Sequence, residues 1–146
     1  MPATVAVAFS GGRDSLALLH ATCRAAQVLG LQVVALHIHH GLLPEADGWL
    51  RSAQRLCARW RRRGWPVHLR WARLDGQPAP GDSIEAWARQ GRQQALARLC
   101  QEEGAGLLLL AQHQRDQAET FLLQALRGGG PAGLSAMPHS MDRGGL

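Results

Sequence analysis

The chain has 146 residues, of which 46% are hydrophobic and 18% charged, and its formal net charge is +5. A chain of this length is expected to form one globular domain with a hydrophobic core. All 16 of its Lys and Arg residues are arginine. The absence of lysine excludes a Schiff-base lysine and a phosphate-binding loop of the G-x-x-x-x-G-K-[ST] type. Any phosphate chemistry must therefore use backbone N–H groups, hydroxyls, arginine or a metal.

The three cysteines, Cys23, Cys57 and Cys100, are far apart in the sequence and form no C-x-x-C pair. Their odd number and spacing indicate neither a disulfide framework nor a zinc site. Each lies in a helical apolar pattern, which favours a buried position. The start of the chain lacks the pattern of a signal peptide, and no apolar run reaches the roughly 20 residues that span a bilayer. We therefore expect a reduced, cytoplasmic protein without a membrane segment.

Short apolar runs alternate with longer helical patterns along the chain. Strands are predicted over residues 3–9, 32–37, 66–70 and 107–111. Helices are predicted over 13–30, 45–63 and 82–104, and again after a turn at 113–116. The alternation predicts an α/β fold, a Rossmann-like parallel sheet with helices on both faces. In such sheets ligands bind at the carboxyl ends of the strands, so the strand-to-helix turns are the places to search for a site.

The helices carry more detailed expectations. The spacing of Ile84, Ala88, Gly91, Ala95 and Leu99 predicts one buried face, and Asp82-x-x-Glu85 resembles a capping box that opens this helix. In the helix over 45–63, the predicted buried face carries Trp49, Ala53, Leu56 and Trp60. The last helix is expected to turn Ala118, Phe121, Leu122, Ala125 and Leu126 inward.

The first turn reads Ser10, Gly11, Gly12, Arg13, Asp14 and Ser15. Adjacent glycines let the backbone approach a ligand, and the following helix N-terminus presents unpaired N–H groups to an anion. Asp14 either caps the helix or helps to hold a cation that bridges to phosphates. The turn S-G-G-x-D-S after an amino-terminal strand resembles the signature of the PP-loop ATP pyrophosphatases. This resemblance implies cleavage of ATP between its α and β phosphates to form an adenylate.

The second turn, His37-Ile38-His39-His40-Gly41-Leu42, is similar to the H-V-x-H-G-L segment of tRNA(Ile)-lysidine synthetases. His37 and His39 are predicted on one face of the strand and His40 on the other. This divergence argues against a metal bound by the histidines. We expect His37, His40 and Gly41 to flank the nucleotide.

Two later segments resemble the same family. Residues 83–92 are similar to its E-x-x-A-R-x-x-R helix, with Glu85, Arg89 and Arg92 along one face. The resemblance assigns Arg89 to nucleotide binding and Arg92 to catalysis; the alternative is a Glu–Arg surface pair. Residues 111–120 and 126–130 are similar to the family's H-x-x-D-D-x-x-E-T and R-G-x-G. This match implies catalytic roles for His113, Asp116 and Glu119.

The resemblance extends from Val5 to Met137 and implies ATP-dependent ligation of free lysine to C2 of the wobble cytidine of tRNA(Ile), through an adenylated cytidine. ATP, lysine and tRNA(Ile) would then be substrates, and Mg²⁺ a cofactor held by Asp14 and Asp116. Residues 1–127 are expected to form the catalytic PP-loop domain, and 128–146 a Gly/Pro-rich tail at the incomplete end of the domain. The chain is therefore expected to be a fragment. A homodimer is left open.

Departures from the family pattern support alternative hypotheses. Arg13 stands where the family usually has an apolar residue, and Arg115 replaces the first aspartate of the Asp-Asp pair. One alternative is therefore a catalytically impaired module that binds nucleotide or tRNA. Another is a different PP-loop tRNA-modifying enzyme such as a thiolase, although the missing C-x-x-C argues against thiolases that need such cysteines.

Eight arginines and no carboxylate lie between Arg51 and Arg73. Arg51, Arg55 and Arg59 repeat at i, i+4 and line one helical face. Such a density of positive charge attracts polyanions, so this face is either a tRNA contact surface or a solvated face of a protein rich in arginine.

Overall fold

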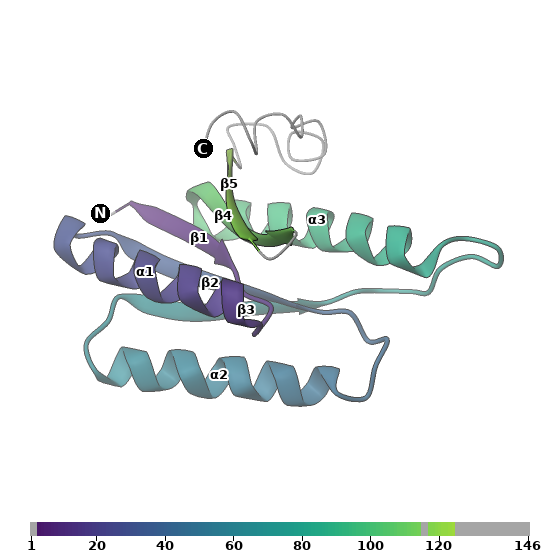
Figure 1. Cartoon of the computed structure of the whole chain (residues 1–146), viewed down its shortest axis with the longest axis horizontal. Coiled ribbons are helices and arrows are strands. Elements are labelled where there is room, and N and C mark those ends of the chain that lie inside the picture. Colours follow the sequence, from purple (N-terminus) through teal and green to yellow (C-terminus); the bar gives the residue numbers. More distant parts are fainter. Residues whose placement is uncertain (1–2, 115–116, 125–146) are drawn as a thin grey trace.

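The computed structural model describes residues 3–114 and 117–124 (Figure 1). The strands are β1 (Thr4–Ala8), β2 (Gln32–His39), β3 (Val67–Arg73), β4 (Ala105–Gln114) and β5 (Gln117–Gln124). The helices are α1 (Arg13–Leu29), α2 (Ala46–Arg62) and α3 (Ile84–Glu103). The sheet has the order β3-β2-β1-β4-β5; β1 to β4 are parallel, and β5 is antiparallel to β4. The predicted α/β architecture is confirmed.

Helices cover both faces of the sheet, as predicted (Figure 1). On one face, α1 and α2 bury a cluster that includes Val7, Leu19, Val33 and Trp60. On the other face, α3 packs its Leu96 and Leu99 against alternate residues of the same strands. Because both faces are buried, the central strands read as almost continuous apolar runs. The chain passes outward from β1 to β3 and then returns to β4 on the other side of β1, so a topological switch point lies between β1 and β4.

The segment after β4 differs from the prediction. The spacing of Ala118, Phe121 and Leu122 predicts a helix, but residues 117–124 form β5, which pairs with β4 from Leu107↔Gln124 to Gln114↔Gln117. The run Thr120-Phe121-Leu122-Leu123 contains β-favouring residues and suits a strand as well as a helix. The unpaired edge of β4 supplies the hydrogen-bond partners that decide between the two. The rest of this predicted helix, including Ala125 and Leu126, and the predicted tail lie outside the described residues.

The start of α3 also corrects two predictions. Its N-cap is Ser83, whose Oγ accepts a hydrogen bond from the N–H of Ala86 at 3.2 Å, so Asp82 does not open the helix. Ile84 is 55% exposed because it lies in the first turn, outside the buried cluster that begins at Ala95. Further along, α3 approaches the chain after β3 closely. A Cβ at Gly91 would stand 3.1 Å from a methyl carbon of Leu74.

The three cysteines are buried, as predicted. Burial raises the pKa of Cys23 to about 12, of Cys57 to about 11 and of Cys100 to about 12. These thiols therefore stay protonated at neutral pH and act as small core residues. None of the helices among the described residues is long and apolar enough to cross a membrane.

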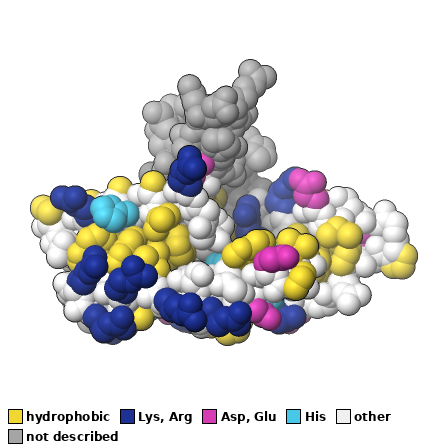
Figure 2. Space-filling view, turned by 60° about the horizontal axis from the view of Figure 1, so that its bottom comes forward, with side chains coloured by type: hydrophobic (Ala, Val, Ile, Leu, Met, Phe, Trp, Pro, Cys, Tyr) yellow, Lys and Arg dark blue, Asp and Glu magenta, His cyan; other side chains and the backbone are white. Residues whose placement is uncertain are grey.

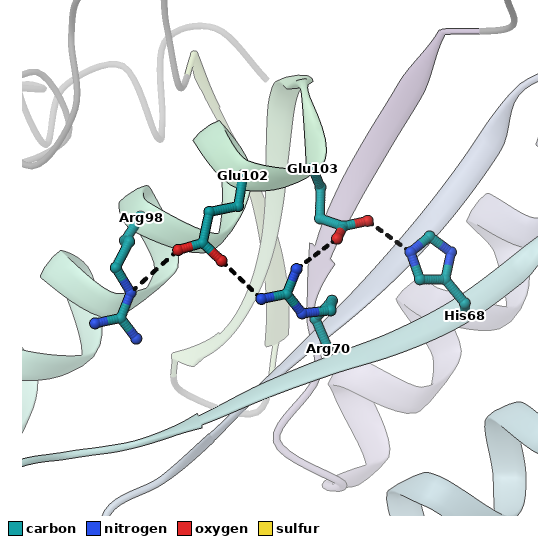
Figure 3. A network of polar contacts seen from close by, with 5 residues as sticks. All are labelled: His68, Arg70, Arg98, Glu102 and Glu103. Atoms are coloured by element: carbon teal, nitrogen blue, oxygen red, sulfur yellow. Dashed lines mark hydrogen bonds and ion pairs between the residues drawn. The ribbon is translucent and has the colours of Figure 1, made fainter.

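A network of hydrogen bonds and ion pairs links the end of α3 to β3 (Figure 3). Glu103 accepts hydrogen bonds from Nε2 of His68 and from the guanidinium of Arg70, both at 2.6 Å. Arg70 also pairs with Glu102 at 2.7 Å, and Glu102 lies 3.7 Å from Arg98. Although burial alone raises the pKa of Glu103, the bonds from His68 and Arg70 outweigh it and hold this pKa below its usual value. The network therefore stabilises the ionised carboxylate.

We expect Glu103→Gln to lower the free energy of unfolding at pH 7 by about 1 kcal/mol, because it removes a partly buried charged partner of Arg70. A carboxyl group with a lowered folded-state pKa contributes stability above its unfolded pKa and loses it as the pH falls through the folded value. The difference from wild type should therefore shrink as the pH falls below about 4.5 and be lost once it has passed the lowered folded pKa. Urea unfolding at a series of pH values across this range measures it. Glu102→Gln, at a more exposed position, is the matched control with a smaller effect; an equal loss in both variants contradicts the prediction.

Candidate nucleotide-binding site

The turn between β1 and α1 holds the predicted loop residues in a closed set of hydrogen bonds. Ser10 Oγ and Ser15 Oγ lie 3.1 Å apart. The Gly12 N–H donates to Ser10 Oγ at 3.2 Å, the Gly11 N–H donates to Ser15 Oγ at 3.3 Å, and Ser15 Oγ donates to the Gly12 carbonyl at 3.1 Å. The two hydroxyls therefore fix the orientation of both glycine amides.

Glycine is required at the first of these positions, where Gly11 has φ +97°. Gly12 is the N-cap residue of α1 and has no side chain with which to cap the helix. The first turn of α1 thus directs its N–H groups and the positive end of its dipole at the space beyond the loop. A cavity of about 390 Å³, here called the loop cavity, lies there and is lined by Ser10, Gly12, Arg13, Asp14, Ser15 and Ala111. This geometry suits an anion such as a phosphate.

A second cavity of about 190 Å³, the central cavity, adjoins the loop cavity at Ser10, Ser15 and Ala111. It lies at the carboxyl ends of β1 and β2 and is also lined by His37, His40, Trp49 and Arg92. The structure therefore brings residues from the first turn, the second turn and α3 together around one cavity. Leu36, Leu96 and Leu110 add apolar surface. A cavity with an apolar lining and a few convergent polar groups is typical of a small-molecule site.

The histidines of the second turn have separate partners. His37 is buried, and its Nδ1 donates to the Phe9 carbonyl at 2.9 Å. Burial lowers the pKa of His37, so its ring is neutral at pH 7 and Nε2 carries a lone pair. His39 is buried too, with Nε2 at 2.7 Å from Asp47 Oδ1 in the first turn of α2. These separate hydrogen bonds position the two rings independently.

Trp49 is a residue of the cavity that the sequence pattern assigns wrongly to the core. It is 43% exposed, and its ring meets that of His40 edge to face with centroids 5.9 Å apart. Ala53 and Trp60 of the same predicted face are buried. Trp49 differs because it lies at the margin of the buried face, which begins with Ala46 and Leu50 in the same turn. The closeness of Trp49 to the histidine-rich turn in the sequence is the signal that could have predicted its place in the central cavity.

Arg92 lines the central cavity and also a third cavity of about 270 Å³, here called the arginine cavity. The arginine cavity is lined by Ile38, His40, Leu74, Glu85, Arg89 and Arg92, with Ala88. Part of Arg92 remains exposed, yet the surrounding atoms desolvate its guanidinium enough to lower its pKa, and the like charge of Arg89 lowers it further. No carboxylate among the described residues forms an ion pair with Arg92. Its charge is therefore available to an anionic ligand.

Arg89 and Glu85 form the i, i+4 pair that was the alternative interpretation of this helix. Their side chains are exposed and lie 3.5 Å apart. Such pairs contribute a few tenths of a kcal/mol at most. The structure thus separates the two arginines, because Arg92 reaches the central cavity and Arg89 does not.

The remaining predicted site residues lie around these cavities or outside the described part. Gly41 has φ +71° in the turn after β2, and a Cβ there would stand 3.4 Å from the Arg73 guanidinium. The backbones of His113 and Glu119 lie on β4 and β5, where His113 pairs with Ala118 and Gln112 with Glu119. Asp116 lies outside the described residues, so the predicted pairing of Asp14 and Asp116 around a metal stays a prediction. The described residues contain no group of three or more metal-ligating side chains.

The predicted basic face lies on the exposed side of α2. Arg51, Arg55 and Arg59 are exposed, while Ala53 and Trp60 are buried on the opposite side of the helix. Figure 2 shows Lys and Arg side chains, all of them arginine here, gathered along this side of the molecule with few acidic side chains between them. The amphipathic pattern is confirmed, and contact with tRNA stays a prediction.

A family model described as the PP-loop domain matches residues 2–146. A tRNA(Ile)-lysidine synthase from Ralstonia nicotianae is 51% identical over 142 residues, which cover 96% of this chain and 30% of that protein. A protein of the same name from Methylococcus capsulatus is 45% identical over 141 residues, which cover 97% of this chain and 30% of that protein. The chain thus spans about 30% of the length of these relatives.

Two solved structures share the fold. The U34-tRNA thiolase NcsA from Methanococcus maripaludis superposes with a TM-score of 0.65 at 16% identity, over 74% of this chain and 37% of that one. A protein of the universal stress protein family from Burkholderia pseudomallei gives a TM-score of 0.53 at 20% identity, over 76% of this chain and 82% of that one. At such identities the similarity concerns the arrangement of the sheet and helices alone.

Proposed function

Because this chain belongs to the PP-loop domain family, we propose that it carries the ATP-binding and adenylating site of an enzyme that ligates lysine to C2 of the wobble cytidine of tRNA(Ile). The observation that supports this proposal most is the convergence of the loop serines, the second-turn histidines and Arg92 on the central cavity. Relatives named tRNA(Ile)-lysidine synthase, 45% and 51% identical over nearly the whole chain, supply the substrate class.

In the proposed complex, the loop cavity receives the triphosphate of ATP. The N–H groups of the first turn of α1 donate to phosphate oxygens, and Arg92 lies close to the departing pyrophosphate. The adenosine then lies in the central cavity beside Trp49 and His40, which offer aromatic surface. The lone pair on His37 Nε2 accepts a hydrogen bond from an adenosine N–H or O–H group.

The proposed reaction has two steps. O2 of the cytidine attacks the α phosphorus, the bond to the β phosphate breaks, and pyrophosphate leaves with the electron pair. The amine of lysine then attacks C2, the bond from C2 to the activated oxygen breaks, and AMP leaves while the amine gives up protons. His113, Asp116 and Glu119 are proposed to bind and deprotonate this amine, in accordance with their assignment from the family pattern.

Mg²⁺ fits the loop cavity through Asp14, which lines it. Magnesium is usually held by one or two carboxylates together with substrate phosphates, so a preformed cage of ligands is not needed. When bound, the ion supplies positive charge that offsets the charge of the phosphates. Asp116 is the proposed second carboxylate.

Two alternatives remain within the family. Arg115 in place of an aspartate favours a module that binds nucleotide or tRNA without efficient catalysis. A thiolase needs reactive cysteines, whereas Cys23, Cys57 and Cys100 are buried with raised pKa values. This observation disfavours the thiolase.

The test is to incubate the purified chain with ATP, free lysine and a tRNA(Ile) transcript that carries the wobble cytidine. We expect pyrophosphate release only with the tRNA, and lysine incorporation into that tRNA. A transcript with uridine at the wobble position is the matched control and should release none. ATP binding without tRNA-dependent pyrophosphate release favours the binding module, and release that depends on a sulfur donor favours the thiolase.

A further inference from the structure

A groove of about 600 Å³ lies between the end of β3 and one side of α3, and the reaction proposed above does not use it. This glutamine groove is lined by Arg73, Leu74, Trp87, Gln90, Gln94 and Arg98. Asp75, Gly91, Ala95 and Gln101 complete the lining. It combines one partly buried indole ring, three glutamine amides and the guanidinium of Arg98, a mixture that differs from the apolar lining of the central cavity.

We propose that the glutamine groove binds a single-stranded segment of the tRNA substrate next to the nucleotide that reacts. This inference rests on the proposed function, because it assumes that an RNA is the substrate. Trp87 offers a stacking surface for a base, and glutamine amides can donate to and accept from base edges. Arg98 supplies a positive charge for a phosphate.

Arg98 is the positive charge of the groove. It lines the groove together with the carboxylate of Asp75, whereas the Arg73 guanidinium lies close to Gly41 in the second turn. Arg98 pairs with Glu102 at 3.7 Å, and both side chains are about half exposed. An exposed pair at this distance is weak, so Arg98 can exchange Glu102 for a phosphate at little cost.

The groove also continues the path that leads out of the candidate site. The loop cavity shares Ser10 and Ser15 with the central cavity, which shares His40 and Arg92 with the arginine cavity. The arginine cavity meets the glutamine groove at Leu74. A strand whose reacting base lies beside the α phosphate, at the mouth of the central cavity, can therefore run past Arg89 and Arg92 and cross Leu74 into the groove. This path lies on the α3 side of the sheet, whereas the exposed arginines of α2 lie on the opposite side.

Trp87→Leu tests the groove, because it keeps an apolar side chain and removes the ring. We expect it to weaken binding of a tRNA(Ile) transcript about 5- to 100-fold, the range for loss of base stacking on an aromatic ring. Trp87→Phe should retain most of the affinity. Trp71→Leu is the matched control, since Trp71 is a solvent-accessible tryptophan on β3 that lines none of the four cavities described above. Filter binding measures the affinities, and unchanged ATP binding in each variant shows that the loop is intact.

The salt dependence tests the phosphate contact separately. Arg98→Gln should reduce the slope of log affinity against log salt concentration by about one. Glu102→Gln breaks the same ion pair but keeps the guanidinium, so its slope should not fall.

Unchanged tRNA affinity in Trp87→Leu overturns the inference, even if pyrophosphate release confirms the proposed reaction. If Trp87→Leu keeps its tRNA affinity but sediments differently from wild type, the groove is a contact surface for protein and the inference is wrong. If wild type binds tRNA through Trp87 but releases no pyrophosphate, the groove stands and the proposed reaction fails.

Discussion

Replacing Ser10 by alanine is expected to reduce tRNA-dependent pyrophosphate release about 100-fold or more, while the fold stays intact. Ser10 Oγ accepts the Gly12 N–H and contacts Ser15 Oγ, so its loss frees an amide that the loop holds in place. Ser10 also lines both the loop cavity and the central cavity, and removal of one preorganised hydroxyl from a site that stabilises developing negative charge has effects of about this size. Steady-state release of pyrophosphate measures the rate, and circular dichroism during heating measures the stability.

Thr22→Ala is the matched control for this variant. Thr22 also lies on α1, and its hydroxyl donates a hydrogen bond to the Leu18 carbonyl at 2.7 Å, away from the loop cavity. Its activity should equal that of wild type. Full activity in Ser10→Ala refutes the assignment of the loop, whereas equal losses in both variants indicate a general effect on α1.

Arg92→Ala should lower pyrophosphate release about 100-fold, and Arg89→Ala should lower it much less. Arg92 reaches the central cavity that contains Ser10 and Ser15, whereas Arg89 lies in the arginine cavity beside Glu85. Arg92→Lys should recover little of the lost rate, because an ammonium group lacks the planar arrangement of N–H groups with which a guanidinium binds two phosphate oxygens at once. Rates with saturating ATP and tRNA, together with the KM for ATP, measure these effects.

Since Arg89→Ala changes the same residue type on the same helix, it controls for the loss of one positive charge. Equal losses from the two alanine variants contradict the separate positions of Arg89 and Arg92. A larger loss from Arg89→Ala assigns the phosphate contact to the arginine cavity instead.

The positions of the first four strands and the first three helices along the chain were predictable from the sequence because local signals agree with one another there. Apolar runs end at glycines such as Gly30 and Gly104, which adopt the left-handed conformation that ends α1 and α3. The segment over 117–124 contains no glycine that marks the end of an element. Its apolar residues satisfy a helical period as well as a strand, and pairing with β4 is a tertiary interaction that one segment of sequence does not reveal.

The candidate site was predictable where a motif fixes the backbone, and less so where the position of a side chain decides. The Ser10 to Ser15 turn predicts an anion site from its residue types alone. Arg89 and Arg92 look equivalent in the sequence, and only their different positions on α3 separate them. Trp49 has the spacing of a core residue, but it lies at the margin of the buried face of α2, beside the buried Leu50.

At residue 91, helix stability and the packing of Leu74 favour different side chains. Alanine in the middle of a helix is favoured over glycine by about 1 kcal/mol, so a mutation to alanine would strengthen α3 in isolation. The same methyl group would stand 3.1 Å from the Leu74 side chain and push it by a few tenths of an ångström. Leu74 is the wall between the arginine cavity and the glutamine groove. A protein engineered for heat resistance at this position would thus gain helix stability while the partition along the proposed RNA path shifts.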